Sequence, residues 1–339
     1  MSWETVIGVE VHVETNTKTK MFCACSADYF GAKPNTHVCP VCLGLPGALP
    51  FTNKNAIEKC IKIGLALGCT ISEKSIFERK NYFYPDLPKG YQISQYRWPL
   101  CVGGSLEVEG ISGKKTIRIN RAHQEEDTGK LTHIGNQTLI DFNRSGLPLV
   151  EIVTEADFRH SSEVRDYCKK LQAIIKATGV SNADMEKGDM RLEANVSVRP
   201  AGQKELAPYR VELKNINSFK FISDAIDYEV ERQIARLEEG QKISQETRGY
   251  NENKKETFLQ RSKEEANDYR YFPEPDLPSL KTTKVEIEKI RSTLTELPSQ
   301  KIEKYKEWGI SDQIAKALVS DQAREILFAQ AMEHVEVID

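Results

Sequence analysis

The first regular element of the chain shows as an alternation of apolar and polar residues. Over residues 5–14, valines alternate with polar positions that include Glu10 and His12. A period of two is typical of a β-strand with one buried face, so we expect a half-buried strand here. Side chains at positions i and i+2 of a strand point the same way, and Glu10 and His12 should therefore share its open face.

Helices and further strands follow in an irregular order. A period of 3.6 predicts helices over residues 52–67, from Ser161 or Ser162 to Gly179, and from Ser223 to Gly240. Short runs rich in β-branched residues predict strands over residues 105–108, 116–120, 138–142, 149–154, 192–199 and 210–214. Because helices and strands mix without a regular βαβ alternation, we expect an α+β fold with a large, mainly antiparallel sheet and flanking helices.

A proline-marked break at residues 274–278 precedes a change in pattern. Beyond about residue 286 the pattern is helical, and Ser311 is placed to cap one of these helices. We therefore expect an α+β domain over residues 1–290 and the start of a small all-helical domain over residues 291–339.

The composition excludes several classes of protein. The 339 residues include 47 Lys or Arg and 50 Asp or Glu, so no overall positive field draws the molecule to nucleic acid, and any such contact must be local. No apolar run approaches the ~18 residues that a membrane span needs, and the N-terminus lacks the features of a signal peptide. We expect a cytoplasmic protein with no membrane partner.

Acidic and imidazole side chains recur on the open faces of the predicted strands. The set is Glu10, His12, Glu125, Glu151, Glu193 and Glu212. Carboxylates that converge on one side of a sheet suit Mg²⁺, which prefers oxygen ligands and bridges protein carboxylates to nucleotide phosphates. Alternatively, these are solvated strand faces whose acids pair with nearby arginines. Those arginines are Arg118, Arg121, Arg191 and Arg210. The residue pattern leaves both interpretations open, because convergence depends on the fold.

The cysteines divide into two groups. Four of the eight lie close together, as Cys23, Cys25, Cys39 and Cys42. Two close pairs of thiolates complete the tetrahedral shell of a Zn²⁺ ion, so we predict a structural zinc site. The alternatives are four buried core cysteines or a redox role for the second pair. The remaining four stand among apolar neighbours and are expected in the core: Cys60, Cys69, Cys101 and Cys168.

Two segments, residues 79–92 and 268–276, combine aromatic side chains with cations and turn formers. Such segments bind a nucleotide or RNA by stacking and phosphate contact, or they pack on a sheet as ordinary aromatic loops. The chain has no Gly-x4-Gly-Lys-Ser/Thr phosphate loop, no Gly-x-Gly-x-x-Gly fingerprint and no Gly-x-Ser-x-Gly elbow. Any use of ATP would therefore not rely on the common phosphate-binding loops.

Several long motifs, all in one order, resemble a known family. They are Gly8-Val-Glu-Val-His-Val-Glu14, Asn81-Tyr-Phe-Tyr-Pro-Asp-Leu-Pro-Lys-Gly-Tyr-Gln-Ile-Ser-Gln95, Glu125-Glu-Asp-Thr-Gly-Lys130, Asp141-Phe-Asn-Arg-Ser-Gly-Leu-Pro-Leu-Val-Glu-Ile-Val153, Gly188-Asp-Met-Arg191, Glu212-Leu-Lys-Asn215, Gln245-Glu-Thr-Arg248 and Asp268-Tyr-Arg-Tyr-Phe-Pro273. From about Trp3 to Pro278 the chain is similar, in register, to the B subunits of tRNA-dependent aspartyl/glutamyl-tRNA amidotransferases (GatB).

The resemblance implies a kinase and transamidase subunit with a cradle-shaped α+β domain. In that family, ATP phosphorylates the side-chain carboxylate of Glu on tRNA(Gln) or of Asp on tRNA(Asn), and ammonia then displaces the phosphate. An amidase, the A subunit, supplies the ammonia from glutamine through an internal channel, and a small C subunit completes a heterotrimer. The implied activity is that of a ligase that forms carbon–nitrogen bonds with glutamine as amido donor. Its implied cofactors are ATP and Mg²⁺, with a structural Zn²⁺ ion.

The resemblance also assigns roles to residues. The catalytic set would be Glu10, His12, Glu125 and Glu151. The cofactor contacts would be Glu193, Glu212, Lys80 and Lys89. The magnesium ligands would be Glu10, His12, Glu125, Glu151, Glu193 and Glu212. The family carries Asp where this chain has Glu193, so the ligand here is longer. The cysteine quartet resembles a zinc site found in part of the family.

Family members continue at the C-terminus through a complete helical domain into a tail domain that contacts tRNA. By that comparison we expect this chain to be C-terminally short, without the tail domain, and to hold tRNA weakly on its own. One rival interpretation is a non-catalytic assembly or tRNA-interaction subunit; another is a zinc-containing nucleic-acid module without chemistry. Mg²⁺-dependent nucleotide binding that requires Glu10 and His12 would separate the catalytic interpretation from the first rival. Metal analysis, and survival of transamidation after Cys39→Ser, would separate the second rival from a simple structural zinc site.

Overall fold

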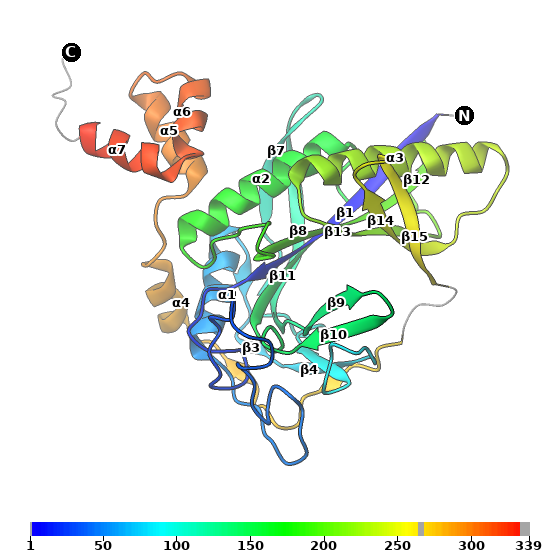
Figure 1. Ribbon diagram of the computed structural model, residues 1–339. Coiled ribbons are helices and arrows are strands. Elements are labelled where there is room, and N and C mark those ends of the chain that lie inside the picture. Colours follow the sequence, from blue (N-terminus) through cyan, green and yellow to red (C-terminus); the bar gives the residue numbers. More distant parts are fainter. Residues whose placement is uncertain (1, 264–267, 333–339) are drawn as a thin grey trace.

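A computed structural model describes residues 2–263 and 268–332, so the last residues of the predicted helical domain lie outside the described part. One ten-stranded sheet dominates the structure (Figure 1). Its strands, in spatial order, are β15 (Glu256–Lys263), β14 (Gln245–Asn251), β13 (Val211–Ile216), β12 (Met190–Pro200), β1 (Trp3–Glu14), β11 (Pro148–Thr154), β8 (Gly113–Glu126), β6 (Cys101–Val102) and β2 (Thr70–Ile71), with β7 (Ser105–Gly110) paired to β8. Among these described strands only β13 and β14 run parallel, which confirms the predicted antiparallel sheet.

Strand β1 runs through the centre of the sheet, between β11 and β12. Its odd-numbered valines are buried in the main core, whereas its even-numbered side chains face the open side of the sheet. In the antiparallel register, Glu10 lies opposite Glu193 of β12, and His12 lies opposite Glu151 of β11. The predicted strand and its two faces are confirmed.

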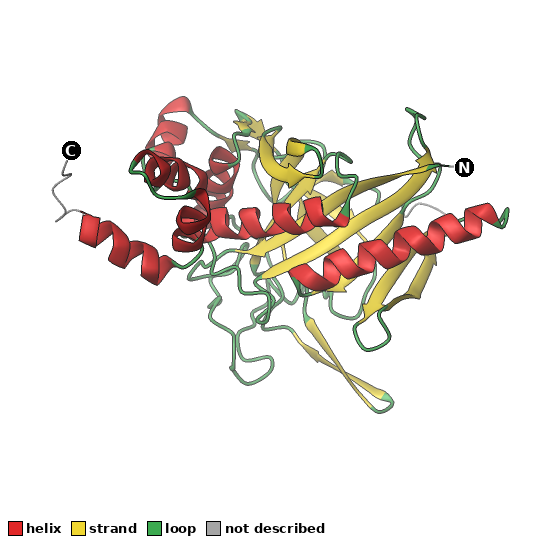
Figure 2. Ribbon diagram, turned by 90° about the horizontal axis from the view of Figure 1, so that it is seen from above, coloured by secondary structure: helices red, strands yellow, loops and turns green. Residues whose placement is uncertain are grey.

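Three long helices accompany the sheet: α1 (Lys54–Ala66), α2 (Ser161–Thr178) and α3 (Phe219–Glu238). Figure 2 shows α2 and α3 lying across one face of the sheet. Apolar side chains of these helices, such as Leu171 and Ile175 of α2 and Ile222 of α3, are buried in the same core as the valines of β1. Burial of apolar surface contributes about 25 cal/mol per Å², so this layer of helices stabilises the domain. The opposite face of the central strands is left for polar side chains.

Helix α2 begins at Ser161, one of the two predicted first residues, whereas the predicted N-cap of α2 and the predicted start of α3 were wrong. Helix α2 has His160 as its N-cap, because Ser161 and Ser162 already lie in the first turn. Helix α3 begins at Phe219, before the predicted Ser223, and the hydroxyl of Ser218 accepts a hydrogen bond from the Lys220 N–H. The predicted cap at Ser311 is confirmed, since its hydroxyl accepts from the Ile314 N–H.

The first turn of α2 contains a buried carboxylate, Glu163, which accepts hydrogen bonds from the Arg159 N–H at 2.8 Å and from Lys115 Nζ at 2.9 Å. Burial alone would raise the pKa of Glu163, but these two bonds outweigh it and lower the pKa below its ordinary value. The stabilisation is therefore present above the ordinary pKa and is lost as the pH falls through the native pKa.

Replacing Glu163 with Gln is expected to lower the free energy of unfolding by about 2 kcal/mol at pH 7, because charge-assisted hydrogen bonds are lost. At pH 3 the difference between variant and parent should shrink. Urea unfolding at both pH values measures it. An equal loss at both pH values would contradict the assigned ion pair.

Smaller elements frame the open face of the sheet. They are the hairpin β9 (Lys130–Ile134) and β10 (Gln137–Asp141), a three-stranded sheet of β16 (Phe272–Pro273), β4 (Glu78–Asn81) and β5 (Tyr91–Ser94), and the pair β17 (Leu280–Lys281) and β3 (Lys74–Ser75). In Figure 1, β9, β10 and β4 lie on the side of the sheet opposite α2 and α3. This arrangement leaves the polar face of β1 between the large sheet and the smaller elements.

The C-terminal part is helical, as the sequence predicts. It comprises α4 (Lys284–Arg291), α5 (Pro298–Glu307), α6 (Asp312–Val319) and α7 (Gln322–Met332). Ile287 and Ile290 of α4 pack against the main core, while Figure 1 shows α5, α6 and α7 together as a separate group. The division into domains at about residue 290 stays a prediction. None of the described helices combines the length and apolar character needed to cross a membrane.

Candidate metal and catalytic site

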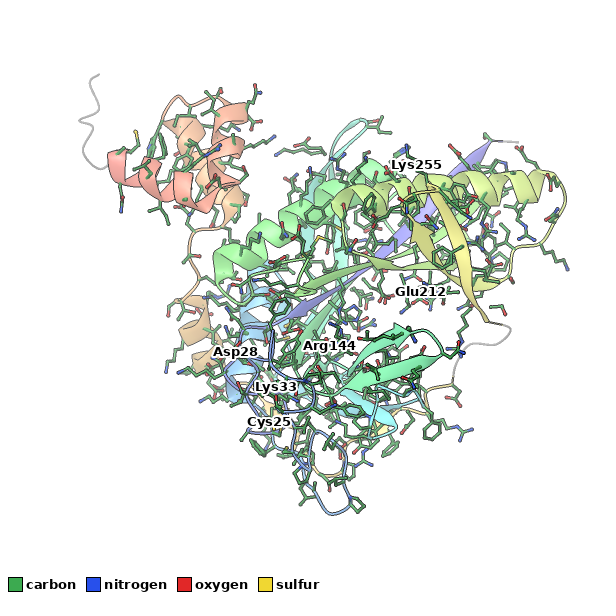
Figure 3. The ribbon with its side chains drawn as sticks, viewed as in Figure 1. Cys25, Asp28, Lys33, Arg144, Glu212 and Lys255 are labelled. Carbon is green, nitrogen blue, oxygen red and sulfur yellow. The ribbon has the colours of Figure 1, made fainter. Side chains whose placement is uncertain are left out.

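Two groups of ligand atoms meet on the open face of the sheet. One group is His12, Glu125 and Glu151, and the other is Glu10, Glu193 and Glu212. Within each group the ligand atoms lie within 4.8 Å of one another, close enough to share one cation. We call them the first and the second carboxylate cluster. Figure 3 labels Glu212 of the second cluster, which projects from the large sheet into the space facing β9 and β10.

The two clusters adjoin because β1 contributes one residue to each. His12 and Glu10 stand two residues apart on the same face, which separates them by roughly 7 Å along the strand. Cross-strand pairing then brings Glu151 to His12 and Glu193 to Glu10. The structure thus brings all six predicted residues together, as two adjoining clusters. Whether these clusters bind Mg²⁺ stays a prediction.

The first cluster contains a second imidazole that the sequence analysis did not identify. His12 Nε2 lies 3.7 Å from Glu125 Oε2 and 3.8 Å from Glu151 Oε1. His123 Nε2 lies closer, 2.8 Å from Glu151 Oε2 and 3.5 Å from Glu125 Oε1. His123 precedes Glu125 by two residues on β8, so the same-face rule applied to Glu10 and His12 could have identified it.

In the second cluster, a lysine amine already lies between two carboxylates. Lys214 Nζ lies 2.8 Å from Glu193 Oε2 and 3.2 Å from Glu212 Oε1. Burial alone would lower the pKa of Lys214, but the two carboxylates outweigh it and raise the pKa above its ordinary value. Lys214 therefore stays charged and supplies part of the positive charge that these acids require. The longer side chain of Glu193 reaches this shared position.

The two clusters differ in how well their negative charge is compensated. Burial and the charge of Glu151 raise the pKa of Glu10 above its ordinary value. In Glu125 the same two effects are outweighed by the hydrogen bond from His123 and the charge of Lys80, and the pKa is lowered to about 2. The first cluster is therefore balanced by nearby cations, whereas Glu10 retains uncompensated repulsion. A divalent cation would relieve that repulsion at Glu10.

The two predicted lysine contacts take different positions. Lys80 of β4 has its Nζ 5.1 Å from the ring centre of Tyr269. Burial would lower its pKa, but the nearby carboxylates, Glu125 foremost, hold the pKa well above its ordinary value. Lys89 pairs instead with Glu126, next to the first cluster. Lys80 is thus one of the cations that act on the first cluster, and the role of Lys89 as a cofactor contact stays a prediction.

The two aromatic segments pack against each other. The Asn81 N–H donates to the carbonyl of Tyr269 at 3.0 Å, and the rings of Tyr82 and Tyr269 meet edge to face with centres 6.1 Å apart. Strand β16, from the later segment, extends the small sheet of β4 and β5. The two segments thus contribute strands to the small sheet itself, and Lys80 lies on one of these strands. Nucleotide binding by these segments stays a prediction.

The solvated-face alternative is wrong for the first cluster. Glu125 is 2% exposed and Glu151 8% exposed, so neither is a solvated surface acid. Arg118 pairs with Asp157, with Nη2 and Oδ1 2.7 Å apart, and thus lies away from both clusters. The positive charge beside these buried carboxylates comes from His123 and Lys80 rather than from Arg118.

A cavity of about 530 Å³ begins at Glu10 and follows β1 away from the clusters. Gly8 leaves space on the same strand face as Glu10, where any other residue would project a side chain. Asn195 Nδ2 donates to Glu10 Oε1 at 2.8 Å and fixes that carboxylate at the mouth of the cavity. Ser197 and Tyr209 contribute to the walls. The cavity is large enough for a substrate portion of nucleoside size.

The four clustered cysteines form a third group of ligand atoms, separate from the two carboxylate clusters. Their sulfur atoms lie within 4.8 Å of one another, as a four-ligand site requires: Cys23, Cys25, Cys39 and Cys42. The hydrogen bond from the Cys23 thiol, the Cys39 N–H at 3.2 Å and the amine of Lys20 together lower the pKa of Cys42 to about 5. The other four cysteines are buried, as predicted.

Metal removal is expected to change the reactivity of the cysteines. With metal bound, the four ligand thiolates should resist alkylation at pH 7. Chelation should expose Cys42 first, because its lowered pKa keeps it as the thiolate, which is the nucleophilic form. Burial and the neighbouring Cys101 raise the pKa of Cys69 to about 12, so this core thiol should stay unreactive throughout.

Mass spectrometry of alkylated peptides, with and without chelator, checks this pattern. Denatured protein, in which all eight cysteines should react, provides the control. Identical labelling before and after chelation would contradict a metal at the quartet.

Taken together, the mainly antiparallel sheet, its two carboxylate clusters and the adjoining cavity define an α+β protein with a polar site on one face of the sheet. A sequence model described as the GatB/GatE catalytic domain matches residues 5–288. The chain belongs to the GatB/GatE family.

Similar proteins cover nearly the whole chain. The B subunit of the aspartyl/glutamyl-tRNA(Asn/Gln) amidotransferase of Persephonella marina is 52% identical over 98% of this chain and 70% of its own length. The proteins of the same name from Roseiflexus sp. and Thermus thermophilus are 52% and 50% identical, over 98% and 93% of this chain and 68% and 66% of their own lengths. The chain thus spans about two thirds of the length of these relatives.

Proposed function

We propose that this chain is the B subunit of an aspartyl/glutamyl-tRNA(Asn/Gln) amidotransferase and contains its ATP-dependent centre. Membership of the GatB/GatE family over residues 5–288 supports the general role. The observation that carries the catalytic part is the meeting of two carboxylate clusters beside a cavity on one sheet face. The reaction is the conversion of Glu-tRNA(Gln) to Gln-tRNA(Gln), or of Asp-tRNA(Asn) to Asn-tRNA(Asn).

The chemistry requires activation of a carboxylate, which is a poor acyl donor. Transfer of the γ-phosphoryl group of ATP to the side-chain carboxylate forms an acyl phosphate. Attack by ammonia then forms the amide and releases phosphate. Lys80 and Lys214, whose pKa values are raised by neighbouring carboxylates, remain charged and would bind the anionic groups of the substrates. Asn195 would hold Glu10 in place where the cavity opens toward the clusters.

The donor sets of the clusters fit magnesium. The second cluster offers carboxylate oxygens alone, and the first adds His12 to two carboxylates. Bound Mg²⁺ would neutralise charge on the transferred phosphoryl group. His123 would orient Glu151 and Glu125 as ligands, through contacts of 2.8 and 3.5 Å.

The cysteine quartet fits zinc in a structural role. Four thiolates leave no open position on a tetrahedral ion, which is typical of structural sites. We further propose that the partners are an amidase (the A subunit), which releases ammonia from glutamine, and a small C subunit, in a cytoplasmic complex. The overall activity would then be that of a ligase with glutamine as amido donor.

Transamidation of Glu-tRNA(Gln) tests this function, with Mg-ATP and ammonium chloride supplied, partner subunits present and glutamine absent. Omitting glutamine separates the activation step from the amidase. Gln-tRNA(Gln) with stoichiometric phosphate release is the expected result. A folded complex that binds tRNA yet forms no amide would contradict the catalytic role and favour an assembly subunit.

A further inference from the structure

Helix α3 carries a fully buried carboxylate on the side of the sheet opposite the site. The side chain of Glu229 is 0% exposed. Arg232 donates to its two oxygens at 2.7 and 3.0 Å, and Thr257 Oγ1 of β15 donates at 3.0 Å. Arg248 Nε of β14 lies 3.4 Å away. Glu229 thus links α3 to the two outermost strands of the sheet.

A buried ionic network is a costly way to attach a helix to a sheet. Removing charges from water costs several kcal/mol per ion, and apolar side chains of similar volume are often equally stabilising. What the network adds is direction, because each hydrogen bond fixes a donor and an acceptor. From Glu229 the network runs along two branches, and each branch ends at the site.

One branch leads through β14 to the second cluster. Arg248 faces α3, where Thr257 also accepts from its Nε at 2.9 Å and fixes its position. The preceding residue, Thr247, points to the other face and donates its hydroxyl to Glu212 Oε2 at 3.0 Å. Thr247 and Glu212 are register partners on the parallel strands β14 and β13. The contacts that hold Arg248 on the α3 side of the sheet therefore also position the adjacent Thr247, whose side chain points to the open face.

The partner strand β15 is irregular opposite these two residues. The pairing of β14 with β15 shifts register between Thr247 and Arg248, so that an extra residue of β15 is accommodated there. Such bulges bend a strand and re-aim its side chains, and they are frequent next to functional sites. Because the ladder between β14 and β15 is interrupted here, the hydrogen bonds from Arg248 to the hydroxyl and carbonyl of Thr257 give β14 an additional attachment to β15.

A second branch leads to the cavity beside Glu10. Gln233, one turn after Glu229 on α3, donates its Nε2 to Glu229 Oε1 at 2.8 Å. Its own Oε1 accepts from the Tyr209 hydroxyl at 3.1 Å. Tyr209 forms part of the cavity wall. One buried carboxylate is thus connected both to a cluster ligand and to a wall of the substrate cavity.

We propose that Glu229 is a positioning residue for the amidotransferase site, holding Glu212 through Arg248 and Thr247 and the cavity wall through Gln233 and Tyr209. The proposal rests on the proposed function, since it takes the second cluster as the cation site. It assigns Glu229 no contact with substrate. Its effect should therefore appear in cation affinity, which a residue that only stabilises the fold would leave unchanged.

The test compares Glu229→Gln with Glu163→Gln in the complete complex. Both variants neutralise a buried, ion-paired carboxylate on a helix, but Glu163 is bonded to Lys115 and the Arg159 N–H and belongs to neither cluster. The readout is the Mg²⁺ concentration at half-maximal transamidation, with ammonium as nitrogen donor. We expect Glu229→Gln to raise it about tenfold, with kcat recovering at high Mg²⁺, and Glu163→Gln to leave it unchanged. Equal midpoints in an active complex would overturn the proposal.

A direct measurement separates this proposal from the proposed function. Binding of Mn²⁺ to the chain, followed by electron paramagnetic resonance, requires no reaction. If the parent complex forms no amide, the proposed function fails, but weaker Mn²⁺ binding by Glu229→Gln would still support the positioning role. Unchanged Mn²⁺ affinity would overturn it.

A double variant tests the route. If Glu229 acts on the cation through Thr247, then Thr247→Val alone should shift the midpoint, and adding Glu229→Gln should shift it little further. Fully additive shifts would overturn the route through Thr247. Should Glu229→Gln fail to fold, Thr257→Val keeps every charge and removes only the hydroxyl between Arg248 and Glu229. A raised midpoint in that variant supports the proposal, and an unchanged one overturns it.

Discussion

Replacing Glu151 with glutamine is expected to slow amide formation by about 10²–10³-fold, the loss typical when a preorganised electrostatic group is removed from an active site. Glu151 lies between two imidazoles, with His12 Nε2 at 3.8 Å and His123 Nε2 at 2.8 Å. Glutamine has nearly the same volume but no charge, so the first cluster would lose a ligand. Buried His123 would also lose the charged partner that raises its pKa.

Steady-state transamidation with ammonium and varied Mg²⁺ measures this effect. The fall should appear in kcat and persist at high Mg²⁺, because the missing oxygen cannot be replaced by more cation. Glu163→Gln is the matched control, because it removes the charge of a buried, ion-paired carboxylate on α2 that belongs to neither cluster. A Glu151→Gln variant that retains most of the parental rate would show that the first cluster takes no part in the reaction.

The second large effect is expected at Lys80, where Lys80→Met should lower kcat by about a hundredfold. The lysine lies close to the buried Glu125 and Glu151, and its positive charge helps to lower the pKa of both. Methionine keeps an apolar stem as long as that of lysine up to Cε but removes the charged amine. The two carboxylates would then repel each other, and negative charge developing on a transferred phosphoryl group would lose a compensating cation.

Lys115→Met is the matched control for Lys80→Met, because Lys115 is also a half-buried lysine that pairs with a carboxylate, Glu163, outside both clusters. Rates of ATP-dependent amide formation should separate the two variants, while thermal unfolding shows that both are folded. Equal rates for Lys80→Met and the parent would mean that Lys80 serves only the packing of β4.

Much of the site could be predicted from the sequence because strand geometry is simple. The alternation over residues 5–14 places Glu10 and His12 on one face, and the structure confirms this. The division into two clusters could not be predicted, since it depends on which residues of β11 and β12 lie opposite them. Cross-strand register follows from the whole sheet rather than from any local pattern.

The outer edge of the sheet escapes prediction for a related reason. Strands β14 and β15 are rich in polar residues, because Glu246 and Arg248 on their inner side belong to the ionic network under α3. A hydrophobic alternation is therefore lacking, and the pattern predicts no strand after the third helix. Thr247, which holds Glu212, lies on this edge and is missed with it.

The most direct test of the whole account is a crystal structure of the protein grown with Mn²⁺ and a non-hydrolysable ATP analogue, examined by anomalous scattering. We expect manganese peaks between His12, Glu125 and Glu151 and between Glu10, Glu193 and Glu212, with the nucleotide phosphates alongside. If manganese binds elsewhere, and His123 and Lys214 remain paired with the carboxylates of both clusters, the assignment of this face as the catalytic centre would be contradicted.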